Sequence, residues 1–159
     1  MDFPSEKFKV DSDASTGLIF IRAYNKWHAA IKHKLRDAGI THPQFVVMTV
    51  INFLSQSDDF VRQATIAKMA DMDVMSVSQI IRGLEEKGYL ARTANPEDTR
   101  ANAVRLLGKG QKAVKRALPI VEKIDDDFFG VLSKDEKPFR DFLHKLIKGA
   151  PSASHPIPL

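Results

Sequence analysis

The sequence predicts a mainly α fold that carries one small β-hairpin. Apolar residues recur every three or four positions through most of the 159 residues, which is the periodicity of amphipathic helices. Near the middle, two short helical segments are joined by a tight turn, and two strand-like runs follow at once. A helix-turn-helix followed directly by a two-stranded hairpin is a winged helix-turn-helix. We therefore expect a winged helix-turn-helix with longer helices on both sides of it in the chain.

The first predicted helix is long and amphipathic. It spans residues 18–38, and its apolar positions are three or four residues apart: Phe20, Tyr24, Trp27, Ile31, Leu35 and Ala38. Gly39 ends it, because glycine readily adopts the left-handed conformation that follows a helix. A second helix is expected to start at Thr41. Thr41 and Gln44 have the spacing of a capping box, and Pro43 suits the first turn.

The helix-turn-helix is predicted in the next segment of the chain. A helix of about two turns starts at Gln63, and a longer one follows Asp73 and stops at Gly88. At 100° per residue, the longer helix has one apolar face, made of Val77, Ile80, Ile81 and Leu84. The opposite face is polar apart from one methionine, with serines on its flanks: Met75, Ser76, Ser78, Gln79, Arg82 and Glu86. This outward face can present hydrogen-bonding side chains to a partner.

The hairpin and the C-terminal helices complete the prediction. The runs YLART, residues 89–93, and NAVRLL, residues 102–107, are strand-like, and the turn-rich ANPEDTRA is expected to be the loop between them. An amphipathic helix is predicted from Gln111 onward, interrupted by Pro119, and a last helix follows Ser133. The chain closes with a Pro- and Ser-rich tail.

Composition and charge narrow the classes of function. The absence of cysteine excludes a disulfide scaffold, a thiolate nucleophile and cysteine-ligated zinc. Neither a secretory leader nor a run of 18 apolar residues is present, so we expect a cytoplasmic protein without membrane insertion. The excess positive charge is concentrated in residues 62–116, which carry 11 basic and 6 acidic side chains. This distribution favours an anionic partner, and a solvated surface is the alternative.

Three stretches together resemble the MarR family of winged helix-turn-helix transcriptional regulators: THPQFVVMTVINFL, TIAKMADMDVMSVSQIIRGLEEKGYLAR and NPEDTRANAVRLLGKG. The resemblance extends through about residues 18–148. It is most specific in the hairpin, where Asp98 and Arg100 stand at the acid-x-arginine signature of the family. One departure is Leu107, which stands where the family commonly has a threonine helix cap, and we expect Gly108 to take over the capping position.

The resemblance implies an organisation and a function. It implies a homodimer whose first and last helices form the interface, and whose two winged helices bind palindromic double-stranded DNA, more commonly as a repressor. The chain is accordingly divided into an N-terminal dimerisation helix, a winged helix-turn-helix DNA-binding region, C-terminal dimerisation helices and a tail, at residues 1–40, 41–110, 111–150 and 151–159.

Residues of two kinds are expected to contact the DNA. Side chains on the outward face of the second motif helix can reach base edges in the major groove: Ser76, Ser78, Gln79 and Arg82. An arginine at the tip of the hairpin, Arg100, suits a narrow minor groove, and Asp98 can hold it by a charge-assisted hydrogen bond. Arg92, at the base of the hairpin, is expected to pair with Asp98 or with a phosphate. The alternatives are capping or solvation for the serines and an exposed ion pair for the loop.

A pocket for a small aromatic or phenolic effector is a further expectation, which rests on the resemblance. The residues expected near it are Arg22, Trp27, His28, His42, Phe45 and Met48. An aromatic, histidine-lined cavity suits a phenolic carboxylate, with Arg22 or one of the two histidines as the partner of the anion. The alternative is that Trp27, Phe45 and Met48 belong to an ordinary dimer core.

Other classes of function have weaker support in the sequence. The glycine-rich, nucleophile-elbow and zinc-helix motifs of common enzymes are absent, and the five histidines show no i, i+4 pairing, so we predict neither an enzyme nor a cofactor. A metal-responsive regulator is an alternative that would use His28, His33 or His42 with a carboxylate. A winged helix used only for protein contacts is another.

Overall fold

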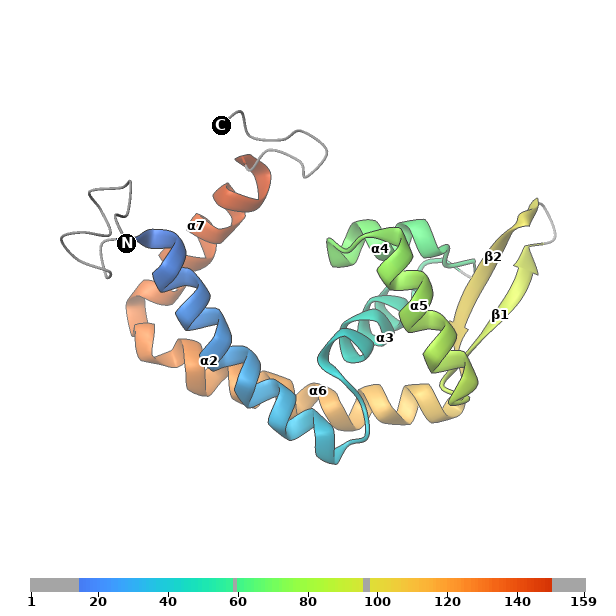
Figure 1. Ribbon diagram of the computed structural model, residues 1–159, viewed down its shortest axis with the longest axis horizontal. Helices are drawn as coiled ribbons and strands as arrows, with labels where there is room; N and C mark the ends of the chain where they lie inside the picture. The colour runs from blue at the N-terminus through green and yellow to red at the C-terminus, as the bar shows by residue number, and fades with distance from the viewer. Residues whose placement is uncertain (1–14, 59, 96–97, 150–159) are drawn as a thin grey trace, which may run out of the picture.

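The computed structural model describes residues 15–58, 60–95 and 98–149, and the side chains of residues 94–102 lie outside this description. The order of elements is helix α2, α3, α4 and α5, the hairpin β1–β2, and then helix α6, a 3-10 segment η2 and helix α7. Figure 1 shows α3, α4, α5 and the hairpin gathered at one end of the molecule, while the first half of α2 and all of α7 lie at the other end. Helix α6 connects the two ends. This arrangement is the predicted winged helix-turn-helix with flanking helices.

Helix α2 ends, and helix α3 begins, at the predicted signals. Helix α2, Thr16–Asp37, is followed by Gly39 with a positive φ of 73°. Helix α3, His42–Leu54, begins with a complete capping box. The Gln44 amide donates to the Thr41 hydroxyl at 3.3 Å, and the Thr41 amide donates to the Gln44 side-chain oxygen at 3.1 Å. The two side chains thus satisfy backbone groups that have no partner within the helix.

The helix-turn-helix consists of α4, Gln63–Ala70, and α5, Val74–Glu86. The turn between them begins with Asp71, which has the left-handed φ of 50° that ends α4. It ends with Asp73, whose carboxylate accepts a hydrogen bond of 2.7 Å from the Ser76 amide. Hydrogen bonding from the Ser76 side chain, and secondarily from the Ser76 amide, lowers the pKa of the Asp73 carboxyl. Helix α5 therefore starts at a defined residue, and the direction of each of its side chains follows.

The hairpin is longer than expected. Strand β1, Leu90–Asn95, pairs antiparallel with β2, Asp98–Leu106, from Leu90 opposite Leu106 onward, with an irregularity at Ala94 and Asn95. Much of the segment expected to be a loop is thus strand, because its backbone groups pair across the hairpin. A second contact anchors β2: the Val104 amide donates to the Val61 carbonyl at 2.8 Å.

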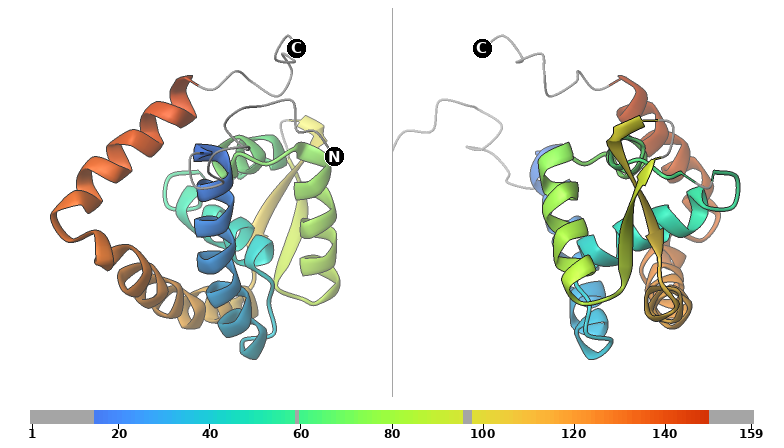
Figure 2. Two further views of the ribbon diagram at one scale, coloured as in Figure 1. Left: turned by 60° about the vertical axis from the view of Figure 1, so that its left-hand side comes forward. Right: turned by 90° about the vertical axis from the view of Figure 1, so that its right-hand side faces the viewer.

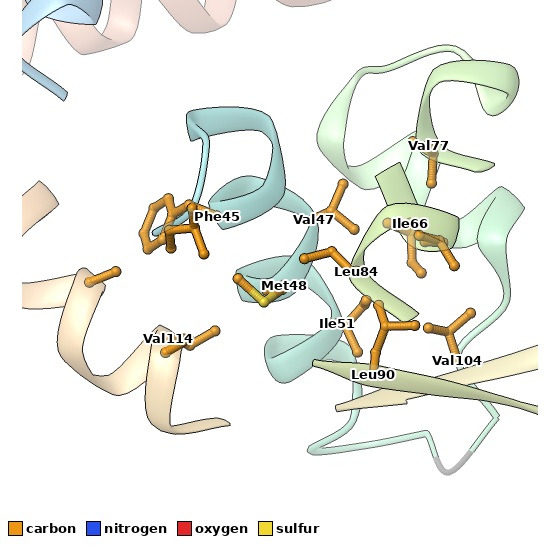
Figure 3. Close-up of a cluster of buried hydrophobic side chains, with 14 of the residues drawn as sticks. Phe45, Val47, Met48, Ile51, Ile66, Val77, Leu84, Leu90, Val104 and Val114 are labelled. Atoms are coloured by element: carbon orange, nitrogen blue, oxygen red, sulfur yellow. The ribbon is translucent and has the colours of Figure 1, made fainter. Parts of the chain in front are cut away.

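One continuous hydrophobic core joins the helices to the base of the hairpin. Most of its fully buried large side chains come from α2, α3, α4, α5 and both strands: Ile31, Leu35, Val47, Met48, Ile51, Ile66, Val77, Ile81, Leu84, Leu90 and Val104. Figure 3 shows Leu84 and Leu90 meeting Met48 and Ile51, with Val114 of α6 at the edge of the cluster. Helix α5 and the base of the hairpin therefore pack against the same hydrophobic core.

Helix α6, Gly108–Phe129, begins differently from expectation. Gly108 is its first residue, and Leu107 occupies the N-cap position without a side-chain hydrogen bond. The Leu107 amide instead donates to the Tyr89 carbonyl at 2.9 Å. A β-carbon at Gly110 would lie only 2.1 Å from that carbonyl oxygen, so only glycine fits there. The start of α6 is set by close approach to the residue before β1 rather than by a cap.

The C-terminal part leaves the core. Segment η2, Gly130–Asp135, includes Ser133 with φ 49° and ψ −120°, and α7, Glu136–Gly149, follows it. No residue of α7 is buried, although Phe142, Leu146 and Ile147 are apolar. None of the described helices combines the length and apolarity needed to cross a membrane.

Candidate nucleic-acid interface

The outward face of α5 lies opposite its buried anchors. Val77, Ile81 and Leu84 are fully buried, and at 100° per residue Gln79 and Arg82 point away from them. Both of these polar side chains are exposed, whereas Ser76 and Ser78, on the flanks, are half-buried. Neither Gln79 nor Arg82 has a side-chain hydrogen bond or ion pair within the part of the chain that the structure describes. Their hydrogen-bonding groups are thus available to a partner.

The base of the hairpin is tied to α5 by an ion pair. The Arg92 Nε donates to the Glu85 carboxylate at 2.8 Å, and the backbone amide of Arg92 donates to the other carboxylate oxygen at 3.4 Å. This hydrogen bonding with Arg92 lowers the pKa of the Glu85 carboxyl. Glu85 was not among the predicted site residues, since a glutamate in the polar stretch Glu85–Lys87 gives no signal of a partner seven residues away. Arg92 was expected to pair with Asp98 or with phosphate, and the structure pairs it with Glu85.

The outer half of the hairpin carries the remaining predicted contacts. The backbone of Asp98 and Arg100 belongs to β2, but their side chains lie outside the described residues. The right-hand view of Figure 2 shows α5 and the hairpin side by side, with the hairpin reaching outward from its base. The structure thus places the two predicted DNA-contacting elements next to each other.

Cationic side chains also line the first half of α6. Lys109, Lys112, Lys115 and Arg116 surround an open hollow. Lys109 is held in place, because its amine donates to the Lys87 carbonyl at 2.7 Å and lies 4.6 Å from the centre of the Tyr89 ring. That contact satisfies a carbonyl at the C-terminal end of α5, where a positive charge is also favoured by the helix dipole.

Three of the residues expected near an effector meet where α2, α3 and α6 come together. The rings of Trp27 and His42 are 5.3 Å apart edge to face, and His28 and His42 are 5.2 Å apart. The Trp27 indole donates a 2.7 Å hydrogen bond to Asp125 of α6. Burial, and secondarily the neighbouring His28, lower the pKa of His42. No group of three or more potential metal-ligating side chains is found in the described ranges.

The other three residues of that expectation lie elsewhere. Phe45 and Met48 are buried in the core of the single chain, and Arg22 lines a separate open hollow on α2. Trp27, besides its contact with His42, borders an apolar groove of about 610 Å³. The groove is lined mainly by aromatic and aliphatic side chains: Phe20, Tyr24, Phe128, Phe129, Val131, Leu132, Phe139 and Leu143. The pair Phe128–Phe129 in an amphipathic stretch was the available sequence signal for this groove.

Comparison with known proteins agrees with this geometry. The model of the MarR family matches residues 40–101, which include α3, α4, α5 and most of the hairpin. An uncharacterised HTH-type transcriptional regulator of Bacillus subtilis, YdcH, is 35% identical over 136 residues, which are 86% of this chain and 92% of YdcH. The chain belongs to the MarR family. It is a DNA-binding transcriptional regulator, and this MarR-family membership confirms the prediction that it is not an enzyme.

Solved structures share the fold of this MarR-family protein. The MepR protein of S. aureus in a complex with DNA has a TM-score of 0.78 at 22% identity, covering 89% of this chain and all of that one. BpsR of Bordetella bronchiseptica, in a structure that concerns regulation of its DNA binding by 6-hydroxynicotinic acid, has a TM-score of 0.76 at 24% identity, covering 89% and 98%. At these identities the likeness shows the winged-helix fold.

Proposed function

We propose that this protein binds a palindromic operator as a homodimer in the cytoplasm and represses transcription there. Helix α5 enters the major groove, where four side chains contact bases or phosphates: Ser76, Ser78, Gln79 and Arg82. The hairpin lies along the adjoining minor groove, into which Arg100 reaches with Asp98 beside it. The observation that carries the proposal is that Gln79 and Arg82 are exposed and have no side-chain partner among the described residues, on the face of α5 beside the outward-reaching hairpin.

Each polar contact has a definite role in this proposal. Gln79 can pair bidentately with an adenine, and Arg82 with a guanine or a phosphate. Each good bidentate pair discriminates against the wrong base by about 1 to 3 kcal/mol. The Glu85–Arg92 ion pair keeps the wing, meaning the hairpin β1–β2, at a constant distance from α5. The major-groove and minor-groove contacts can then form together.

Dimerisation through residues 1–40 and 111–150 is supported by exposed apolar surface. In α2, Ile19, Phe20 and Ile21 are about half exposed, and in α7, Leu146 and Ile147 are 62% and 68% exposed. The first half of α2 and helix α7 lie at the end of the molecule opposite to the wing. Large apolar side chains left exposed on two flanking helices support a protein interface there. A second copy of the chain would cover these side chains and set the distance between two α5 helices.

Selection of binding sites from random duplexes tests the function. Enrichment of a palindrome with half-sites about one helical turn apart supports it. Arg100→Ala should weaken binding, and Gln79→Ala should relax specificity at one base pair of each half-site. A dimer that neutralises about 6 to 10 phosphates loses roughly 10³ to 10⁵ in affinity between 50 and 200 mM salt. No enrichment and a flat salt response would favour the alternative, a winged helix used for protein contacts.

The dimer is tested by mass in solution. Ile147→Glu places a charge on the exposed apolar side of α7 and should produce a monomer that keeps its helical content. Lys148→Glu, on the same helix and also exposed, is the matched control and should remain a dimer. A dimeric Ile147→Glu variant would show that α7 is not part of the interface.

Release by a small aromatic anion is the regulatory part of the proposal. The site would be the junction of Trp27, His28 and His42, which the neighbouring apolar groove extends. Trp27 is the single tryptophan of the chain, so its fluorescence reports binding there directly. Titration with 6-hydroxynicotinic acid and with simple phenolic carboxylates should quench this fluorescence and release the operator for an accepted ligand. A shift in melting temperature with zinc, reversed by a chelator, would instead favour a metal-responsive regulator.

A further inference from the structure

The N-terminal turn of α5 exposes a large apolar side chain in the middle of a polar surface. Met75 is 72% exposed, which makes it one of the most exposed large apolar side chains of the described residues, and the preceding Val74 is 52% exposed. On the same helix, Val77, Ile81 and Leu84 are completely buried against the core. Packing of α5 onto the core therefore does not account for a methionine at this position.

Helical geometry places Met75 on the same line as the polar side chains that face outward. At 100° per residue, Met75, Gln79 and Arg82 fall within an arc of about 60°, with Met75 one turn before Gln79. Val74 lies about 100° away on the flank. Because the Asp73 cap holds the start of α5, Met75 keeps this direction in the first turn. The N-terminal residues of such a helix are the ones that approach base edges.

We propose that Met75 recognises the C5-methyl group of a thymine in the major groove. The inference rests on the proposed function and adds one specificity-determining residue to it. The thymine methyl is the apolar group among the base edges of that groove, and an apolar side chain is its matching contact. An unbranched thioether side chain can adapt its shape to such a group.

Another occupant for Met75 has less support. The apolar surfaces assigned to the second copy of the chain lie on α2 and α7, at the end opposite to the wing, whereas α5 lies beside the wing. Met75 is on α5, so it lies outside the surface proposed for the dimer interface. On α5 its neighbours are Gln79 and the exposed Arg82, which suit base edges and phosphates.

The position of the thymine follows from the helix. Met75 and Gln79 are four residues apart, which is about 6 Å along the helix axis at 1.5 Å per residue. Successive bases of one DNA strand are about 3.4 Å apart. The thymine should therefore lie within about two base pairs of the base pair whose specificity is relaxed in Gln79→Ala.

Replacement of thymine by deoxyuridine tests the proposal, because it removes the methyl group and leaves every hydrogen-bonding group in place. Each thymine of the selected operator is replaced in turn, in both half-sites, and affinity is measured by fluorescence anisotropy. One position should weaken wild-type binding about fourfold per half-site, the effect of one buried methyl-sized group, and so about 15-fold for a symmetric site. Met75→Ala should weaken binding to the thymine operator similarly, and should no longer distinguish thymine from deoxyuridine there.

Two comparisons make the outcome decisive. Met69→Ala removes another exposed methionine, on α4, and should keep the full preference for thymine over deoxyuridine. A specific operator whose binding is indifferent to deoxyuridine, or a Met75→Ala variant that keeps the wild-type preference, would overturn the inference while leaving the proposed function standing. A half-site without thymine within reach of Gln79 would do the same. Failure to select any operator would refute the proposed function, and the inference with it.

Discussion

Replacement of Gly110 by alanine should push the start of α6 away from Tyr89, at the base of the wing. A β-carbon on Gly110 would lie 2.1 Å from the Tyr89 carbonyl oxygen and 3.2 Å from a methyl carbon of Leu106. A carbon and a carbonyl oxygen normally stay about 3.3 Å or more apart. The nearest atom belongs to the backbone, so a change of rotamer cannot relieve the overlap. Helix α6 and the residue before β1 must instead move apart by about 1 Å.

The loss of folding stability in Gly110→Ala can be worked out from these contacts. Overpacking a closely packed contact destabilises a protein by about 1 to 3 kcal/mol. The movement also weakens the hydrogen bond from the Leu107 amide to the Tyr89 carbonyl, which contributes about 1 kcal/mol. Alanine is a better helix former than glycine by up to about 1 kcal/mol, which offsets part of the loss. The net destabilisation is about 2 kcal/mol, or a melting temperature lower by about 4 to 8 °C.

Gly108→Ala is the matched control, since a β-carbon there meets open space in the same turn of α6. It should leave the melting temperature unchanged or raise it slightly. Thermal unfolding of both variants is monitored by circular dichroism at one protein concentration, because association with a second copy would also shift the melting temperature. Operator affinity should fall for Gly110→Ala alone. A Gly110→Ala protein as stable as Gly108→Ala would refute the reasoning, and with it the close approach of α6 to Tyr89.

Three further predictions test other parts of the structure. Gly83→Ala, in the interior of α5 with open space around its α-carbon, should stabilise by about 0.5 to 1 kcal/mol in urea denaturation. Glu85→Gln removes an ion pair whose side chains are about one-third exposed, so it should cost less than about 1 kcal/mol at pH 7. Because the pKa of Glu85 is lowered in the folded state, this difference should vanish as the pH falls below about 4, and a constant difference would contradict the pairing with Arg92. Burial lowers the pKa of His42, so the unfolded chain takes up its proton more readily, and wild-type stability should fall as the pH drops below about 6.5. His42→Gln should lose part of this dependence, while the exposed His33→Gln should keep it, and identical pH profiles for all three proteins would exclude His42 as the cause.

The order of elements could be predicted because their signals are local. The capping box of Thr41 and Gln44 satisfies amides within one turn, and glycine at position 39 ends a helix through its own backbone freedom. The spacing of residues along α5 predicts both its apolar face and its outward polar face. Gln79 and Arg82 could be proposed as DNA contacts for that reason, before any tertiary contact was known.

Other features depend on residues that are distant in the sequence or on the approach of two backbones. The length of the hairpin follows from pairing between two strands, so turn-favouring residues at positions 94–101 indicated a longer loop than the structure has. Glu85 receives its role from Arg92 on β1, and Gly110 receives its role from a carbonyl near the start of that strand. The aromatic groove combines α2, α6, η2 and α7.

The sequence by itself therefore determined the helices, their caps, the winged-helix order and the exposed face of α5, because periodicity and capping act within a few residues. Only the tertiary structure decided how far the strands pair, what holds the wing against α5, where α6 begins and which aromatic side chains share a groove. Those properties depend on distances between atoms that the chain brings together only when it folds, and residue type alone does not encode such distances.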